Sequence, residues 1–284
     1  MRFLKHTYLI LAFCIGIMYS CRKAKLNKST TTVENYVTAQ YLYQEAYFSV
    51  LKALNAHEIS YKIEDQDTNK CETLVVNVPS ENEKVFRIDY GASCTDEDKL
   101  NRKGKIIAAL TGEVNTEGST LEITFEDFYI NHYKVEGTET IKYLGNNADS
   151  ILVENGLITL PNNTDVISWE CLMKQTKVEG AETMFSFNVE DSCYLSEFCF
   201  YDDVYQITGY IKAINQEGRL FDAKTTQNLI GTFCDKQFVI LQGKVDVQPE
   251  NLRLRAVNFG DGDCDNDIDV TVKKKTSTLS VSPW

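Results

Sequence analysis

The spacing of apolar residues along the chain changes once, near residue 58. Before that point, between residues 33 and 55, tyrosine, valine and leucine recur every three or four positions. This spacing places them on one face of an α-helix. Thr31 and Glu34 have the separation of a capping box, in which each side chain bonds a free backbone donor at a helix start. The sequence therefore predicts one amphipathic helix over about residues 33–55.

After residue 58, apolar and polar residues alternate with a period of two, which is typical of β-strands with one buried face. Asn155-Gly156 and Glu217-Gly218 have the composition of tight hairpin turns. No second long helical segment follows, which argues against a parallel βαβ architecture. We therefore predict a mainly β protein of antiparallel sheets, as a sandwich or a stacked sheet, after one N-terminal helix. The segments with strand periodicity are 73–78, 85–90, 105–111, 121–129, 151–159, 205–214 and 253–259.

A repeated sequence segment suggests that a hairpin unit occurs more than once within the β region. The segment Lys134–Ile141 (KVEGTETI) recurs as Lys177–Met184 (KVEGAETM), each time after an apolar stretch and a polar turn. Repeated units of this kind bury faces against one another that neither could bury alone. We expect a helix plus a first β unit over residues 33–146 and a second β unit over residues 147–284.

The first 21 residues have the pattern of an export signal. Arg2 and Lys5 precede an apolar run of about eleven residues, whereas a transmembrane helix needs about 20. The Ser20-Cys21 pair, followed by polar residues, resembles a bacterial lipobox, in which the cysteine thiol is acylated and becomes the first mature residue. We predict a signal peptide at residues 1–20, lipidation of Cys21 and a lipid-anchored tether over residues 21–32. An ordinary secretory signal with an incidental cysteine is the alternative.

The charge balance argues against a nucleic-acid partner. The chain has 29 basic and 41 acidic residues, a formal charge of −12, and removal of Arg2 and Lys5 with the signal peptide makes the balance more negative. A phosphate backbone would be repelled by most of this surface, and no basic stripe with interleaved aromatic residues is present in the sequence.

The mature chain is expected to form disulfides, because an exported protein meets an oxidising compartment. A second repeated pattern places an aromatic-Gly strand end before a cysteine, as Ile88–Gly91 before Cys94 and as Val257–Gly260 before Cys264. This repetition suggests the pairs Cys71–Cys94 and Cys234–Cys264. Cys193 and Cys199 could close a small loop, which would leave Cys171 free and buried. No C-x-x-C pair is present, so structural zinc is not expected.

One acidic loop and one short motif are candidate sites. Asp261, Asp263, Asp265 and Asp267 offer the oxygen ligands that calcium prefers, although the spacing departs from that of an EF-hand. The alternative is a turn in which Asp side chains cap their own backbone, followed by a strand with solvent-facing Asp residues. Ca²⁺ is the only cofactor that the sequence suggests. Asp149-Ser150-Ile151 resembles a Bacteroidetes O-glycosylation motif and makes Ser150 a candidate acceptor.

The segments IDYGASC (88–94), KVEGTETI (134–141) and VNFGDGDCDN (257–266) resemble a group of Bacteroidetes envelope lipoproteins over most of the mature chain. This resemblance implies export and a β-rich body, and it implies no activity. In such lipoproteins, acidic residues after the lipidated cysteine accompany display on the cell surface. Arg22, Lys23 and Lys25 occupy these positions here, which favours the periplasmic face of the outer membrane.

The sequence contains no recognisable catalytic motif. G-x-S-x-G and H-E-x-x-H are both missing, and only His57 and His132 follow the signal region. We therefore expect a non-enzymatic envelope protein, attached to the membrane through its lipid, that binds or scaffolds a protein or glycan. The alternative is a hydrolase that acts on an envelope polymer or glycan.

Overall fold

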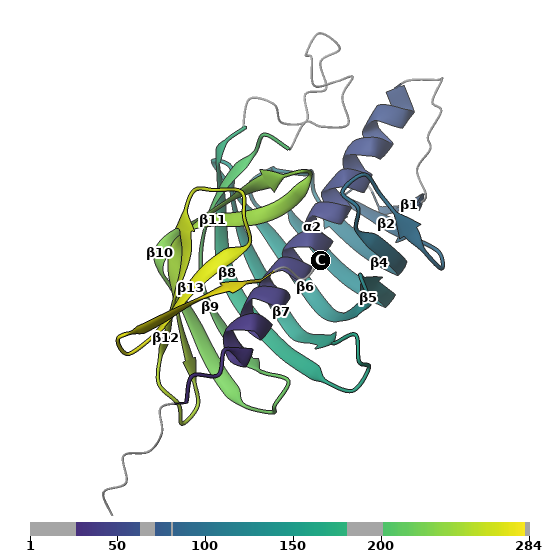
Figure 1. Ribbon diagram of the computed structural model, residues 1–284. Helices are drawn as coiled ribbons and strands as arrows, with labels where there is room; N and C mark the ends of the chain where they lie inside the picture. Colours follow the sequence, from purple (N-terminus) through teal and green to yellow (C-terminus); the bar gives the residue numbers. More distant parts are fainter. Residues whose placement is uncertain (1–26, 63–71, 81, 181–200, 282–284) are drawn as a thin grey trace, which may run out of the picture.

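The computed structural model describes residues 27–62, 72–80, 82–180 and 201–281, and it consists of one helix and one large antiparallel sheet (Figure 1). Apart from the short β3, which pairs with β4, each strand pairs with the next one along the chain. The predicted mainly β, antiparallel architecture with an N-terminal helix is confirmed. The strands are β1 (Thr73–Ser80), β2 (Glu83–Asp89), β3 (Cys94–Thr95), β4 (Asn101–Thr111), β5 (Thr120–Ile130), β6 (Tyr133–Gly145), β7 (Ala148–Thr159), β8 (Val166–Glu179), β9 (Val204–Ile214), β10 (Leu220–Cys234), β11 (Gln237–Pro249), β12 (Arg255–Asp261), β13 (Asp267–Val272) and β14 (Lys275–Ser280).

The helix α2 (Thr31–Lys62) lies in the concave side of the sheet, which curves around it (Figure 1). It contacts β4, β6, β8 and β11, strands that are far apart in the sheet. Every side chain from Ala39 to Leu51 is buried, including those of Gln40 and Glu45, because the curved sheet covers more than one face of the helix. Among the described residues, no helix has the length and apolar character needed to cross a bilayer.

The two predicted β units belong to a single continuous sheet. The expected boundary falls at Asn146 and Asn147, in the tight turn between β6 and β7, and these two strands pair with each other along most of their length. The two KVEG segments hold different places in the sheet. The first lies at the start of β6, whereas the second begins at the end of β8 and runs into residues outside the described part of the chain.

One of the two predicted hairpin turns is confirmed and the other is wrong. Glu217-Gly218 lies in the turn that joins β9 to β10. Asn155-Gly156 lies inside β7, where Asn155 has a φ of 53° and the register with β8 shifts between Val153 and Gly156. An Asn-Gly pair supplies positive φ for a β-bulge as readily as for a hairpin turn, so composition alone did not distinguish them.

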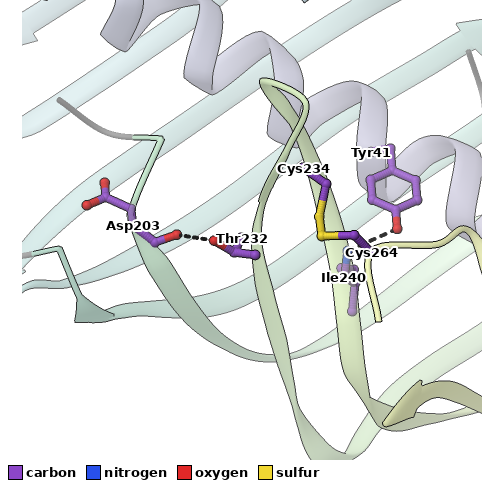
Figure 2. The surroundings of a disulfide bond; sticks show 6 residues. All are labelled: Tyr41, Asp203, Thr232, Cys234, Ile240 and Cys264. Carbon is purple, nitrogen blue, oxygen red and sulfur yellow. Dashed lines mark hydrogen bonds between the residues drawn. A yellow bond between two sulfur atoms is a disulfide. The ribbon is translucent and has the colours of Figure 1, made fainter. Parts of the chain in front are cut away.

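The disulfide between Cys234 and Cys264 is confirmed, with Cα atoms 5.9 Å apart. It joins the end of β10 to the loop between β12 and β13 (Figure 2). Cys171 is free and buried, as expected. Cys71, Cys193 and Cys199 lie outside the described residues, and so do the pairs predicted for them, including Cys71–Cys94.

Replacing both Cys234 and Cys264 with serine is expected to lower the free energy of unfolding by about 2–4 kcal/mol, because the unfolded chain is then less constrained. Urea unfolding of the oxidised proteins measures the difference. The single Cys234→Ser variant should lose a similar amount, since it breaks the same bond. A double variant as stable as the wild type would contradict the prediction.

Candidate functional site

A pocket opens at the end of the sheet where β6 turns into β7, beside the second half of α2. We call it the end pocket. It encloses about 540 Å³ of space between atoms, including solvent at its mouth. Most of its lining side chains are polar or aromatic, and they come from the helix and from four neighbouring strands or the residues beside them. Those used below are Tyr47, Tyr143, Asp149, Lys177, Asp203 and Tyr205.

Strand register brings these side chains together. Tyr143 of β6 is opposite Asp149 of β7, and Lys177 of β8 is opposite Tyr205 of β9. Residues two apart on a strand share a face. Asp149 therefore shares its face with the buried Ile151, toward α2. Tyr47 completes the pocket from α2.

One half of the end pocket contains a buried ion pair, which uses one of the two Asp203 carboxylate oxygens and leaves Oδ1 without a hydrogen bond among the described residues. The Asp203 side chain is fully buried, and its Oδ2 accepts hydrogen bonds from Lys177 Nζ at 2.6 Å and from the Tyr205 hydroxyl at 2.7 Å. The Asp203 backbone carbonyl accepts a hydrogen bond from the Thr232 hydroxyl at 2.8 Å, which fixes the start of β9 (Figure 2). Burial raises the pKa of Asp203, although Lys177 and the Tyr205 hydroxyl act in the opposite direction.

Gly180 allows this arrangement. A side chain there would place its Cβ 2.2 Å from Asp203 Oδ1, well inside van der Waals contact, and the φ of Gly180 is 81°. The glycine of the second KVEG segment therefore lets the chain approach the buried carboxylate closely.

The other half of the end pocket is poorly paired. Among the described residues, the Asp149 carboxylate accepts one hydrogen bond, from the Tyr47 hydroxyl at 3.4 Å. Burial raises the pKa of Asp149 to about 6, opposed by the Tyr47 hydroxyl and by Lys177. The Tyr143 hydroxyl is buried without a well-formed hydrogen bond among the described residues, and it interacts weakly with the neighbouring Tyr47 hydroxyl. At neutral pH Asp149 thus supplies a carboxylate beyond the Lys177–Asp203 pair.

Polar side chains continue behind the end pocket, between α2 and the sheet. Gln175 is opposite Asp149 in the sheet, and Gln40 and Gln44 lie one turn apart on α2. The amide groups of all three are buried without a hydrogen bond among the described residues. Glu139 lies deeper on the same face of β6 as Tyr143, and its Oε2 is likewise unpaired there. Burial raises the pKa of Glu139 well above its usual value.

Glu139→Gln is expected to stabilise the protein at pH 8 by about 1–3 kcal/mol, because the amide has no charged form for burial to disfavour. Because the folded pKa is raised above the unfolded one, the contribution of Glu139 is most favourable below the unfolded pKa and is lost as pH rises. The variant and the wild type should therefore differ little at pH 4 and increasingly above it. Urea unfolding across this range measures both. A variant that is less stable at pH 8 would show that the Glu139 charge is paired.

A second group of buried charges joins α2 to β4 and the loop before it. Arg102 donates hydrogen bonds to both carboxylate oxygens of Asp98, at 3.1 and 2.6 Å, to Ser49 Oγ at 3.0 Å and to Glu45. Lys52 Nζ lies 2.5 Å from Asp98 Oδ2. Burial alone would raise the pKa of Asp98, but Arg102 and Lys52 hold it below its usual range. Since these charges are mutually paired, we assign the cluster a structural role.

The acidic loop is an exposed turn with local hydrogen bonds. Asp261, Asp263, Asp265 and Asp267 all line one shallow surface depression. Asp265 Oδ1 accepts a hydrogen bond from the backbone N–H of Asp267 at 3.1 Å, as expected of the capped turn. Within the described residues no three acidic, histidine or cysteine side chains are grouped closely enough to hold a metal ion. Calcium binding at this loop stays a prediction.

The remaining predicted sites lie apart from the end pocket or outside the described residues. Ser150 is half-buried in β7, where it alternates with Asp149 and so belongs to the opposite face of the sheet. Its glycosylation stays a prediction. Cys21 lies outside the described residues. The sequence therefore suggested none of the pocket side chains as site residues. Asp149 was named only as the first residue of the motif that makes Ser150 a candidate acceptor.

Comparison with known proteins adds no relative from which a function could be transferred. No protein-family model, no curated protein and no solved structure matches this chain. The resemblance to Bacteroidetes envelope lipoproteins stays a prediction from the sequence, and the class of protein rests on the fold and the end pocket alone.

Proposed function

We propose that this protein is a lipid-anchored envelope protein with a non-enzymatic binding role, and that the end pocket is its ligand site. The observation that carries the proposal is the pairing of groups in that pocket. Asp149 is half-buried there with one weak hydrogen bond among the described residues, and the buried Tyr143 hydroxyl has no well-formed hydrogen bond among them. Buried polar groups in folded proteins are usually paired, so a ligand that pairs with these two gains binding energy.

The N-terminal contacts support an orientation in which the end pocket faces away from the membrane. Arg255 donates hydrogen bonds to the Ser29 carbonyl at 3.3 and 3.4 Å, which hold the start of the described chain against β12. From Cys21 to Asn27 the chain spans at most about 20 Å. Tyr47 lies about 24 Å beyond Thr31 along the helix axis. A lipid on Cys21 would therefore hold the opposite end of the body against the bilayer.

The lipid anchor is tested with Cys21→Ala in a bacterial host that processes lipoproteins. The wild-type protein is expected to be labelled by an alkyne-tagged fatty acid and to enter the detergent phase on Triton X-114 partitioning. The variant should lose both properties. Label on the variant, or none on the wild type, would contradict the proposed anchor.

Ligand binding is tested by thermal shift with the full-length protein in detergent, against amino acids, short peptides and monosaccharides of envelope polymers. Tyr143→Phe removes only the unpaired hydroxyl and should reduce the shift caused by a true ligand. Tyr133→Phe is a matched control, because Tyr133 does not line the end pocket. A shift that both variants reduce equally would place binding elsewhere, and no shift with any compound would count against the proposal.

A hydrolase is the second candidate, because the end pocket contains two carboxyl groups whose pKa values are raised. General acids often have such pKa values. Against this, the ion pair with Lys177 and the hydrogen bond from Tyr205 favour the charged form of Asp203, which cannot donate a proton. Product formation from a bound ligand, lost in Asp149→Asn, would favour the hydrolase. Binding without turnover favours the proposed role.

A further inference from the structure

The half of the end pocket around Asp149 has acceptors for a cation. The Asp149 carboxylate is mostly buried, and its one weak partner leaves most of its acceptor capacity unused. The buried Tyr143 hydroxyl has no well-formed hydrogen bond within the described chain, and the Tyr47 hydroxyl lies beside both groups, interacting weakly with Tyr143 and at 3.4 Å from Asp149. A carboxylate and two phenol oxygens thus surround one small space.

The other half shows how this pocket pairs a carboxylate. The Lys177 ammonium forms an ion pair with Asp203, with Nζ 2.6 Å from Oδ2. The same ammonium lies 5.8 Å from the centre of the Tyr205 ring. Asp203 therefore has a cation and a tyrosine as partners, whereas Asp149 has tyrosines and no cation of its own. Among the described residues that line the end pocket, two aspartates and one lysine give one negative charge in excess at neutral pH.

We propose that the end pocket binds a ligand through a primary ammonium group, which pairs with Asp149 and donates to the hydroxyl oxygens of Tyr143 and Tyr47. This inference rests on the proposed binding function and specifies its ligand class. An ammonium has three donors and no acceptor, which matches these three oxygens. The faces of tyrosine rings also attract cations.

The geometry disfavours other cations. A hard metal ion such as calcium takes six to eight oxygen ligands, and among the described residues no three acidic, histidine or cysteine side chains are grouped closely enough to hold a metal ion. A guanidinium is a planar fork with five donors, and the narrow space beside Asp149 offers it few acceptors.

The test measures binding of three small probes of similar shape to the full-length protein in detergent, by saturation-transfer NMR titration at pH 7.5. The probes are n-butylammonium, n-butanol and butyrate, which differ in charge at one end. We expect n-butylammonium to bind at least tenfold more tightly than the other two. Equal binding of the ammonium and the alcohol would overturn the inference, because the charge would then contribute nothing.

Asp149→Asn removes the carboxylate and is expected to weaken n-butylammonium binding at least tenfold. Asp235→Asn is the matched control. It removes the same charge from an exposed turn with a φ of 49°, which asparagine tolerates, and it should bind as the wild type does. Equal weakening in both variants would show that only the overall charge matters and would overturn the inference.

A pH titration of the wild type keeps the test valid even if Asp149→Asn does not fold. Within the described part of the chain, the titratable groups that line the pocket around Asp149 are Tyr47 of α2, Tyr143 of β6, Lys177 of β8, and Asp203 and Tyr205 at the start of β9. With the pKa of Asp149 at about 6, lowering the pH from 7.5 to 5.0 should weaken n-butylammonium binding about tenfold, as the carboxylate is protonated. Binding that does not change over this range would overturn the inference.

The outcomes also separate this inference from the proposed function. If a neutral saccharide or peptide binds in a manner sensitive to Tyr143→Phe while n-butylammonium does not bind, the end pocket is a ligand site of another class. The ammonium inference then fails and the proposed function stands. If no compound of either panel binds, both fail.

Discussion

Arg102→Met is expected to lower the free energy of unfolding by about 3–5 kcal/mol, because it leaves buried carboxylates without their partner. The Arg102 side chain is 2% exposed, and it bonds Asp98 and Glu45, whose side chains are 0% and 1% exposed. Methionine occupies part of the same space without a charge. Asp98 keeps Lys52, whereas Glu45 loses its strongest partner. Urea unfolding at pH 7 measures the loss.

Arg87→Met is the matched control, since Arg87 pairs with Glu126 at 2.9 Å on the surface, with both side chains about half exposed. Exposed pairs contribute little, so we expect a change below about 1 kcal/mol. Combining Arg102→Met with Glu45→Gln and Asp98→Asn should recover part of the loss, because the buried negative charges are then gone as well. Equal effects of the two single variants would contradict the structural role of the buried cluster.

The sequence around Arg102 shows why this cluster was not predicted. Residues 101–105 read Asn-Arg-Lys-Gly-Lys, a basic stretch that is typical of a solvated strand end or turn. Strand alternation places Arg102 on the helix-facing side, where its partner Glu45 comes from 57 residues earlier in the chain. Alternation along a strand predicts which face is buried only when the residues of that face are apolar. Here the buried face includes charges that are neutralised by distant residues.

The strands themselves were predictable where alternation runs without interruption. Residues 85–90 and 205–214 coincide closely with β2 and β9. The region of β6 was predicted as part of a repeated hairpin and not as a separate strand. A β-bulge at Gly137 explains why its alternation was not recognised. The register with β7 shifts between Glu136 and Thr138, which moves the apolar residues out of phase. Gly137 has a φ of 112°, a conformation that only glycine adopts readily.

The end pocket could not be found from the sequence, because its polar side chains come from five separate elements and share no motif. The one local signal is chemical. Lys177 and Asp149 are in phase with the buried residues of their strands, Met173 and Ile151 among them. A charged residue in phase with a buried face indicates either a strand end or a site. Pairing within the sheet was needed to show that both lie at the same end.

Phe48→Ala is expected to lower the free energy of unfolding by about 3–5 kcal/mol, the range for removing a large aromatic side chain from a packed core. Phe48 is fully buried, and its ring centroid lies 4.8 Å from that of Phe233, 5.1 Å from that of Phe238 and 5.5 Å from that of Tyr205. These contacts join the middle of α2 to β9, β10 and β11. The measurement is urea unfolding, with the thermal midpoint as a second observable.

Leu172→Ala is the control, because Leu172 is 57% exposed and its loss should change stability by no more than about 0.5 kcal/mol. Phe48 also stacks on Tyr47, with centroids 5.8 Å apart, so it supports two of the tyrosines that line the end pocket. We therefore expect Phe48→Ala to weaken n-butylammonium binding at temperatures where the variant is still folded, whereas Leu172→Ala should not. If Phe48→Ala were as stable as the wild type, the helix would not be held by this aromatic cluster, and the position of Tyr47 in the end pocket would need another cause.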